Sequence, residues 1–162
     1  MKIRIGTLAI GLAMVALPSV GAGVSWGQDP NLTPIAGSLT LSSGFQPDPR
    51  VIAVRAGGTI DASNISAECR GFISNAPDVR LNYTAGPMLP LIISVASAAD
   101  TTLVVSGADG SWYCDDDGGT FDSNPMVRLN NPQSGRYEIW VGTYRAGRTE
   151  TARLHISEVG SQ

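Results

Sequence analysis

The residues best suited to chemistry are aspartates gathered around a Gly-Gly turn, in the stretch SWYCDDDGGTFDSN from Ser111 to Asn124. Between Leu81 and Val127 there are six aspartates and no Lys, Arg or His. Clustered carboxylates repel one another unless a cation or water separates their charges. Aspartate and loop carbonyl oxygens are the ligands that Ca²⁺ prefers. The sequence therefore predicts a calcium site of a β-loop type, with ligands among these aspartates: Asp100, Asp115, Asp116, Asp117 and Asp122.

The same stretch has a second interpretation. It does not follow the helix–loop–helix calcium motif, because Gly119 and Thr120 stand where that motif needs other residues and no Glu closes the loop. A solvated acidic turn, partly neutralised by arginines, is the alternative. Five arginines follow the turn in the chain: Arg128, Arg136, Arg145, Arg148 and Arg153.

No group of residues indicates catalysis, so we predict no catalytic residue. His155 is the single histidine, and the alternation of its strand places it on the solvent face. No serine lies in a Gly-x-Ser-x-Gly turn. Adjacent aspartates share one environment, whereas glycoside hydrolysis needs two carboxyl groups held apart with different pKa values. A secreted peptidase-related or glycan-acting enzyme remains the alternative class.

Aromatic side chains near the acidic turn are candidate contacts for a ligand on a protein or glycan surface. These are Trp112, Tyr113, Trp140 and Tyr144. Trp140 is opposite in parity to Tyr137, Ile139 and Val141, so it leaves the face that they share. Packing in a secondary cluster is the other interpretation of these aromatics.

The two cysteines and the N-terminus both indicate export. Residues 1–27 have the layout of a cleaved signal peptide, with Lys2 and Arg4 before a short apolar run and small residues. We therefore expect a secreted or periplasmic protein with no membrane span in its mature form. In that setting Cys69 and Cys114 are most simply one disulfide.

Cleavage after residue 27 also changes the charge. It removes Lys2 and Arg4, so nine arginines and no lysine face 14 acidic residues, a net charge of −5. Lysine Schiff-base chemistry is then excluded. An acidic chain with scattered arginines also argues against nucleic-acid binding.

Short runs with period-two alternation predict the fold. We expect a disordered N-terminal segment at 28–36, one domain at 37–158 and a tail at 159–162. Turn residues separate the predicted strands at roughly ten-residue spacing, and no long helical periodicity occurs. The run Leu89–Ser97 is almost continuously apolar and predicts a central strand covered on both sides. The pattern indicates an all-β chain that forms an antiparallel β-sandwich, with jelly-roll topology as the first choice.

Several motifs together resemble the bacterial pre-peptidase C-terminal domain. They are the apolar run Pro90–Ser97, Asp100-Thr-Thr-Leu103, the Asp109-Gly110 turn, Asp115-Asp-Asp117, and Ser134-Gly-Arg-Tyr137 through Tyr144. The resemblance covers roughly Leu81 to Ser157. It implies a jelly-roll module that is accessory to secreted proteases and in some members binds calcium. We therefore expect an exported, non-catalytic binding or accessory module. A structural envelope protein is a further alternative, favoured if Trp112 and Trp140 are buried.

Overall fold

The structure is a computed structural model that describes residues 27–121 and 123–162. Its described elements are strands and one short 3₁₀ helix. They are β1 (Ser38–Ser42), β2 (Arg50–Ala56), β3 (Ile60–Asp61), η1 (Ala62–Asn64), β4 (Phe72–Ile73), β5 (Val79–Thr84), β6 (Leu91–Ala96), β7 (Thr101–Ser106), β8 (Trp112–Asp115), β9 (Met126–Leu129), β10 (Gly135–Thr143) and β11 (Glu150–Ser157).

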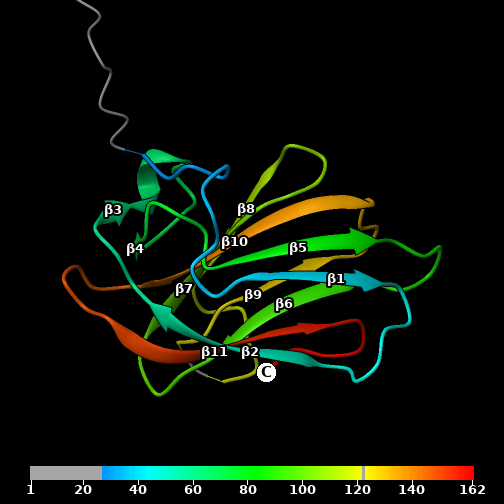
Figure 1. Ribbon diagram of the computed structural model, residues 1–162. Coiled ribbons are helices and arrows are strands. Elements are labelled where there is room, and N and C mark those ends of the chain that lie inside the picture. The colour runs from blue at the N-terminus through cyan, green and yellow to red at the C-terminus, as the bar shows by residue number, and fades with distance from the viewer. Residues whose placement is uncertain (1–26, 122) are drawn as a thin grey trace, which may run out of the picture.

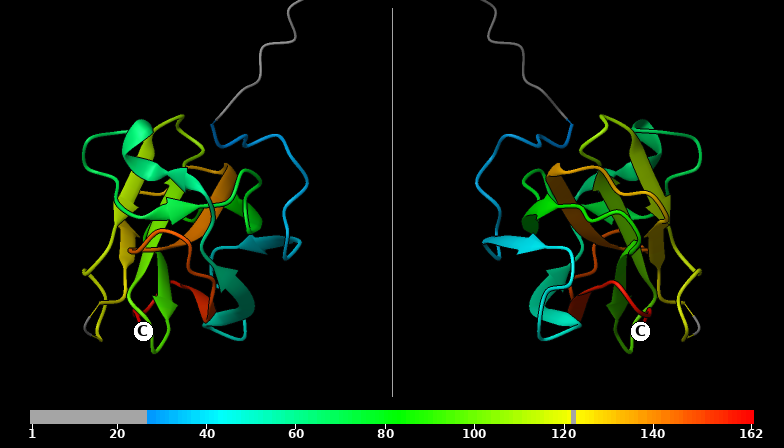
Figure 2. Two further views of the ribbon diagram at one scale, coloured as in Figure 1. Left: turned by 90° about the vertical axis from the view of Figure 1, so that its left-hand side faces the viewer. Right: turned by 90° about the vertical axis from the view of Figure 1, so that its right-hand side faces the viewer.

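The longer strands form two sheets that pack face to face (Figures 1 and 2). One sheet has the order β2-β11-β6-β9, and the other has the order β5-β10-β7-β8 with β1 added beside β5. Along the chain, successive long strands cross repeatedly between the two layers, and this strand order is that of a jelly roll. The predicted β-sandwich is confirmed.

Strand β10 is the centre of the larger sheet. It pairs with β7 along one edge, and with β5 and then β4 along the other. At Glu138, for example, the partners are Ser106 of β7 on one side and Arg80 of β5 on the other. Strand β1 pairs with β5 in parallel, whereas the other described strand pairs are antiparallel. Strands β3 and β4 extend this sheet past the beginning of β5.

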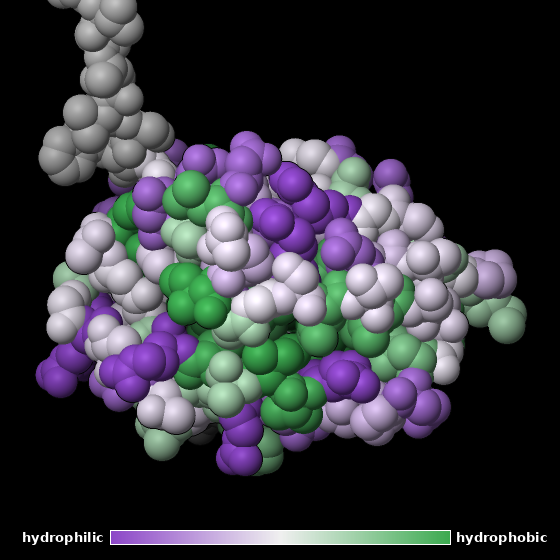
Figure 3. Space-filling view, viewed as in Figure 1, coloured by the Kyte–Doolittle hydropathy of each residue, from purple (hydrophilic) through white to green (hydrophobic). Residues whose placement is uncertain are grey.

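The main core fills the space between the sheets. Along β5, Val79, Leu81 and Tyr83 are buried and alternate with more exposed residues, as the sequence pattern predicts. Each fully buried aliphatic side chain stabilises the fold by about 1.5–3 kcal/mol. The sandwich is less closed on the side between edge strands β1 and β2, where Figure 3 shows hydrophobic surface. Leu39 and Ile52 pack there against the core while remaining partly exposed.

A second, smaller core lies on the outer face of β10. Trp140 is fully buried in it and stacks at a tilt on Trp112, with ring centroids 5.6 Å apart. Beside the two rings, Cys69 and Cys114 form the predicted disulfide, with 5.0 Å between their Cα atoms. The disulfide ties the segment before β4 to β8, which confirms the predicted pairing.

The N-terminal segment at 28–36 differs from the predicted disorder. Its backbone amides bond to the loop before β5: Asp29 to the carbonyl of Asn75 at 2.9 Å, and Ile35 to that of Pro77 at 2.9 Å. Two of its carbonyl groups also accept from the guanidinium of Arg80. Arg80 in turn pairs with Glu138, which is 2 % exposed on the outer face of β10. The segment is therefore a cover for a buried ion pair, which local composition does not reveal.

Asp78 is a buried acid at the junction of β4 and β5 on the edge of β10. It is 2 % exposed, and its Oδ2 accepts from the backbone N–H of Val141 at 2.7 Å. The carboxylate thus satisfies the backbone N–H of Val141 on the edge of β10, where β5 does not supply a backbone carbonyl. Burial raises the pKa of Asp78 to about 7, against the opposing hydrogen bond from Val141.

We predict that Asp78 makes the folded state less stable as pH rises. The carboxyl group loses its proton near pH 3.8 in the unfolded state but only near pH 7 in the folded state. The bound proton therefore stabilises the folded state fully below pH 3.8, and this stabilisation is lost progressively as the pH rises to about 7. Over this window the wild type should lose about 4 kcal/mol relative to Asp78→Asn, at 1.36 kcal/mol per pKa unit. Urea unfolding from pH 4 to pH 8 measures this difference.

Asp109→Asn is the control, because hydrogen bonds from Tyr113 and Ser111 lower the pKa of that exposed aspartate. This variant should not remove the decline in stability. Identical pH profiles for the wild type and Asp78→Asn would contradict the assignment.

Candidate functional site

The acidic stretch is the connection that carries the chain from β8 in one sheet to β9 in the other. Asp115 closes this loop at its base, because its Oδ2 accepts from the backbone N–H groups of Gly118 at 2.7 Å and Met126 at 2.8 Å. A carboxylate oxygen that accepts two backbone hydrogen bonds stabilises the conformation of the loop.

Asn124 fixes the other end of the loop and was not identified from the sequence. It is 3 % exposed, and its Oδ1 accepts from the N–H of Ser97 at 3.1 Å and the hydroxyl of Thr101 at 3.0 Å. Its Nδ2 donates to the carbonyl of Ser97 at 3.0 Å. The loop is thereby joined to the β6–β7 connection. An asparagine before a proline gives no sequence signal for such a role.

Asp116 and Asp117 lie close enough to Asp100 for their charges to act on it. The pKa of Asp100 is raised, first by partial burial and then by the charges of Asp117 and Asp116, while Arg145 opposes the shift. Among the described residues, no three acidic, histidine or cysteine side chains form a group that could hold a metal ion. Asp122 lies outside the described residues. Calcium binding therefore stays a prediction, with Arg145 present as a competing countercharge.

Beside Asp100 lies a charged hollow at the turn between β10 and β11. Its volume is about 220 Å³, and its lining residues are Ala99, Asp100, Thr143, Arg145, Arg148 and Glu150. The backbone N–H of Tyr144 donates to the carbonyl of Asp100 at 3.2 Å, which holds the turn against the β6–β7 connection. Because both charge signs line the hollow, it can receive polar groups of either sign.

Tyr144 is the predicted aromatic that the structure leaves accessible, at 47 % exposure. It lines a second hollow of about 420 Å³ that includes Arg70 and Phe72, and its chain neighbours Thr143 and Arg145 line the charged hollow. An exposed tyrosine beside such a hollow provides contact area and a hydroxyl group for a partner surface.

The other predicted aromatics lie elsewhere. Trp140 is fully buried, so it is corrected from a candidate ligand contact to a core residue. Trp112 is half-buried against it. Tyr113 is half-buried, and its hydroxyl donates to Asp109 Oδ2 at 2.5 Å, which directs it toward the β7–β8 turn.

A shallow groove lies on the outer face of the smaller sheet. Its volume is about 670 Å³, and it is lined by Ala53, Ala96, Ser97, Ala98, Phe121, Thr151, Ala152 and Arg153. The acidic loop and the C-terminal tail join beside it, because the N–H of Thr120 donates to the carbonyl of Gln162 at 3.2 Å. The N–H of Gln162 also donates to Ser94 Oγ at 3.1 Å. Phe121, which follows Thr120, is 62 % exposed.

The same tail explains why the predicted exposure of His155 is wrong. His155 pairs with Ser94 on the outer face, yet it is 8 % exposed, because the tail folds back over this row of the sheet. Neither ring nitrogen has a hydrogen-bond partner in the part of the chain that is described. Burial, and then the charge of Arg153, lowers the pKa of His155. A neutral, enclosed imidazole does not present a base to a substrate.

Comparisons with known proteins do not assign a family. No family model matches the chain, and no curated protein matches it. Among solved structures, it is similar to PliG of Aeromonas hydrophila, a periplasmic inhibitor of g-type lysozyme, at 13 % identity and a TM-score of 0.41. That match covers 74 % of this chain and 96 % of the other. Such a likeness does not establish a shared function, and the resemblance to the pre-peptidase C-terminal domain stays a prediction.

Within residues 27–121 and 123–162, no helix is long and apolar enough to cross a bilayer.

The calcium prediction is tested by thermal melting. A site with a dissociation constant near ~0.1–1 mM, at tenfold excess, adds about 1.4 kcal/mol and raises Tm by roughly 3–6 °C. Magnesium should do less at matched ionic strength, because it demands tighter octahedral geometry. The double variant Asp116→Asn with Asp117→Asn should lose the calcium-specific shift. Equal shifts with both ions would instead favour neutralisation by Arg145.

Proposed function

We propose that this protein is an exported, non-catalytic module that binds a protein partner through one end of its sandwich. This binding end comprises Tyr144, the charged hollow around Asp100 and Arg145, and the adjoining groove beside Phe121. The observation that carries the proposal is that two exposed aromatic side chains lie beside hollows lined by arginines: Phe121 lines the groove with Arg153, and Tyr144 lines the hollow with Arg70. The groove and the charged hollow are lined in part by consecutive residues, Ala98 with Ala99 and Thr151 with Glu150.

The composition of this end supports contact with a protein. Aromatic residues and arginine are enriched at protein–protein interfaces, where they supply most of the binding energy. The surrounding loops are held together by hydrogen bonds that Asn124 and Asp115 accept through their side chains and by one that the backbone N–H of Tyr144 donates. A surface that is ordered before binding loses less conformational entropy in the complex.

A binding role also accounts for the placement of the chemically versatile side chains. Asp115 shapes a loop, the cysteines form a disulfide, and His155 is enclosed beneath the tail. Turnover of peptides or common glycosides that disappears with His155→Ala or Asp116→Asn would favour the alternative of a secreted hydrolase.

Export is supported by the disulfide together with the N-terminal sequence. Disulfides form and persist in oxidising compartments, and the apolar run of residues 1–27 has the length of a signal peptide. We therefore place the mature protein outside the cytoplasm, either in the periplasm or secreted.

The burial of Trp140 and half-burial of Trp112 favour one second candidate, a structural envelope protein. A structural role requires self-association at working concentration. A monomer over a wide concentration range, measured by sedimentation, would exclude this candidate.

Site-specific photo-crosslinking in the producing cell tests the proposed binding end. A benzophenone amino acid at Tyr144 should give a discrete crosslinked product with a partner protein. The same group at Met88, which is 86 % exposed on the β5–β6 loop, is the control. Both positions are exposed, so equal labelling or labelling at Met88 alone would contradict the proposal.

A further inference from the structure

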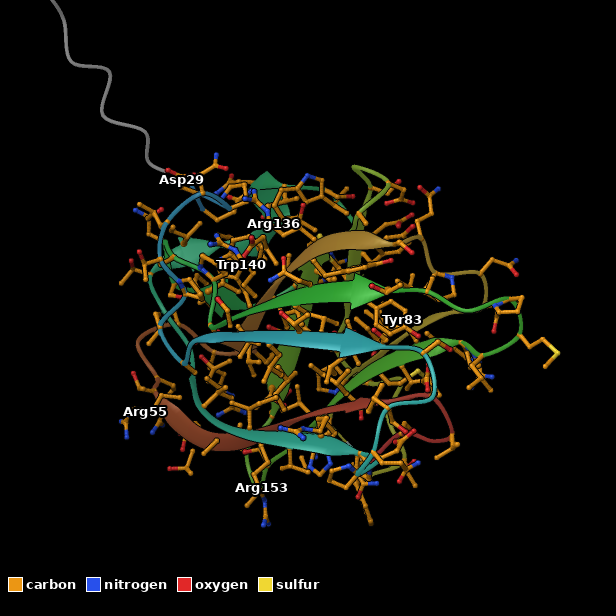
Figure 4. The ribbon with its side chains drawn as sticks, turned by 45° about the vertical axis from the view of Figure 1, so that its right-hand side comes forward. Asp29, Arg55, Tyr83, Arg136, Trp140 and Arg153 are labelled. Atoms are coloured by element: carbon orange, nitrogen blue, oxygen red, sulfur yellow. A yellow bond between two sulfur atoms is a disulfide. The ribbon has the colours of Figure 1, made fainter. Side chains whose placement is uncertain are left out.

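The outer face of the smaller sheet carries a second feature, two arginines that form no salt bridge with any residue that the structure describes. Arg55 on β2 and Arg153 on β11 are exposed and occupy diagonal positions, because Ala53 faces Arg153 and Thr151 faces Arg55. Diagonal residues on antiparallel strands lie roughly 7–8 Å apart. Figure 4 shows both side chains directed away from the sheet into solvent. Two positive charges on one face of the sheet favour the binding of anionic groups there.

Within residues 27–121 and 123–162, neither guanidinium forms a salt bridge. The described salt bridges involve Arg80 and Arg136, which both pair with Glu138 on the other sheet. Arg153 also acts on its surroundings, because its charge contributes to lowering the pKa of His155. The protein has a net negative charge, so Arg55 and Arg153 form a positively charged patch on a chain that is acidic overall.

The two arginines stand on a continuous trough. The groove beside Phe121 shares Ala53 and Thr151 with another hollow, of about 400 Å³, that reaches over the edge of β2. Arg55 lines this second hollow, together with Ile35 of the N-terminal segment. The trough thus runs across β6, β11 and β2, from one exposed hydrophobic residue to another. Phe121 is 62 % exposed and Ile35 is 63 % exposed.

The floor of the trough indicates the shape of its occupant. It contains alanines and small polar residues, so that no bulky side chain fills it. The three strands under the trough span two interstrand spacings, or about 10 Å. When the ends at Phe121 and Ile35 are included, an extended peptide of about six to eight residues covers its length. Among the described residues, Asp78 is the one carboxylate that lines the second hollow. It is 2 % exposed and its Oδ2 accepts from the N–H of Val141, so it does not present a free carboxylate to an acidic ligand.

We infer that this trough binds an extended acidic segment of a partner protein, with its carboxylates on Arg55 and Arg153 and its hydrophobic side chains on Phe121 and Ile35. The inference deepens the proposed function and rests on it. A peptide is favoured over an anionic glycan because the ends of the trough are hydrophobic anchors. A glycan would need more hydrogen-bonding side chains along the floor than Thr151 and Ser97 supply.

Fluorescence anisotropy with labelled peptides tests the inference on the mature protein. The probes are a Glu/Leu peptide of about eight residues, the same peptide with Lys in place of Glu, the same peptide with Ser in place of Leu, and a sulfated dextran. We expect the Glu/Leu peptide to bind best, and its affinity to fall with added salt. Arg55→Glu with Arg153→Glu should weaken binding about tenfold, since two exposed charge pairs are lost.

Arg128→Glu is the control, because Arg128 is exposed on β9 and bonds to Asn130 outside the trough. Binding to this variant should stay within about twofold of wild type. Equal binding of the Glu/Leu and Glu/Ser peptides and the dextran would overturn the inference, since only unspecific charge attraction would remain. No binding of the Glu/Leu peptide would also overturn it. Neither outcome affects a crosslink at Tyr144, so failure of this inference is distinguishable from failure of the proposed function.

Discussion

The architecture of the binding end depends on how the chain crosses from one sheet to the other between β8 and β9. This crossing carries the acidic stretch, and polar side chains hold it rather than hydrophobic packing. Asp115, at the start of the loop, accepts from Gly118 within it and from Met126 at its far end, and Asn124 joins the loop to the β6–β7 connection. Buried amides and carboxylates hold their positions only when their hydrogen bonds are satisfied together. The groove, the C-terminal tail and the charged hollow all adjoin this connection.

The two chain ends complete the sandwich by covering polar groups on its outer faces. The N-terminal segment covers the pair of Arg80 and Glu138. Near the C-terminus, the N–H of Gln162 donates to Ser94 Oγ at 3.1 Å, and His155, which pairs with Ser94, is 8 % exposed. Buried charges are costly unless they are paired. The folded unit therefore extends beyond residues 37–158 at both ends. Ordered segments at 28–36 and 159–162 border the proposed binding surfaces.

The sequence predicts what local pattern can determine. Alternation located the long strands, the burial of β6 on both sides and the opposite parity of Trp140, and the cysteine count predicted the disulfide. Alternation assigns a residue to a face but does not say what covers that face. For this reason the alternation predicts His155 at the surface and Trp140 as a candidate ligand contact, although both are buried. The trough combines residues from six segments of the chain, so no local pattern reveals it.

Chemical-shift mapping tests the central claim that the groove side of the smaller sheet is the binding surface. Amide shifts of the ¹⁵N-labelled mature protein are followed while the acidic, leucine-containing peptide is added. Our account predicts that the largest changes lie at Ala53, Ala96, Thr151 and Arg153, with smaller changes across β5 and β10. Changes centred on the β5–β6 loop around Met88, or on the face covered by the N-terminal segment, would contradict it.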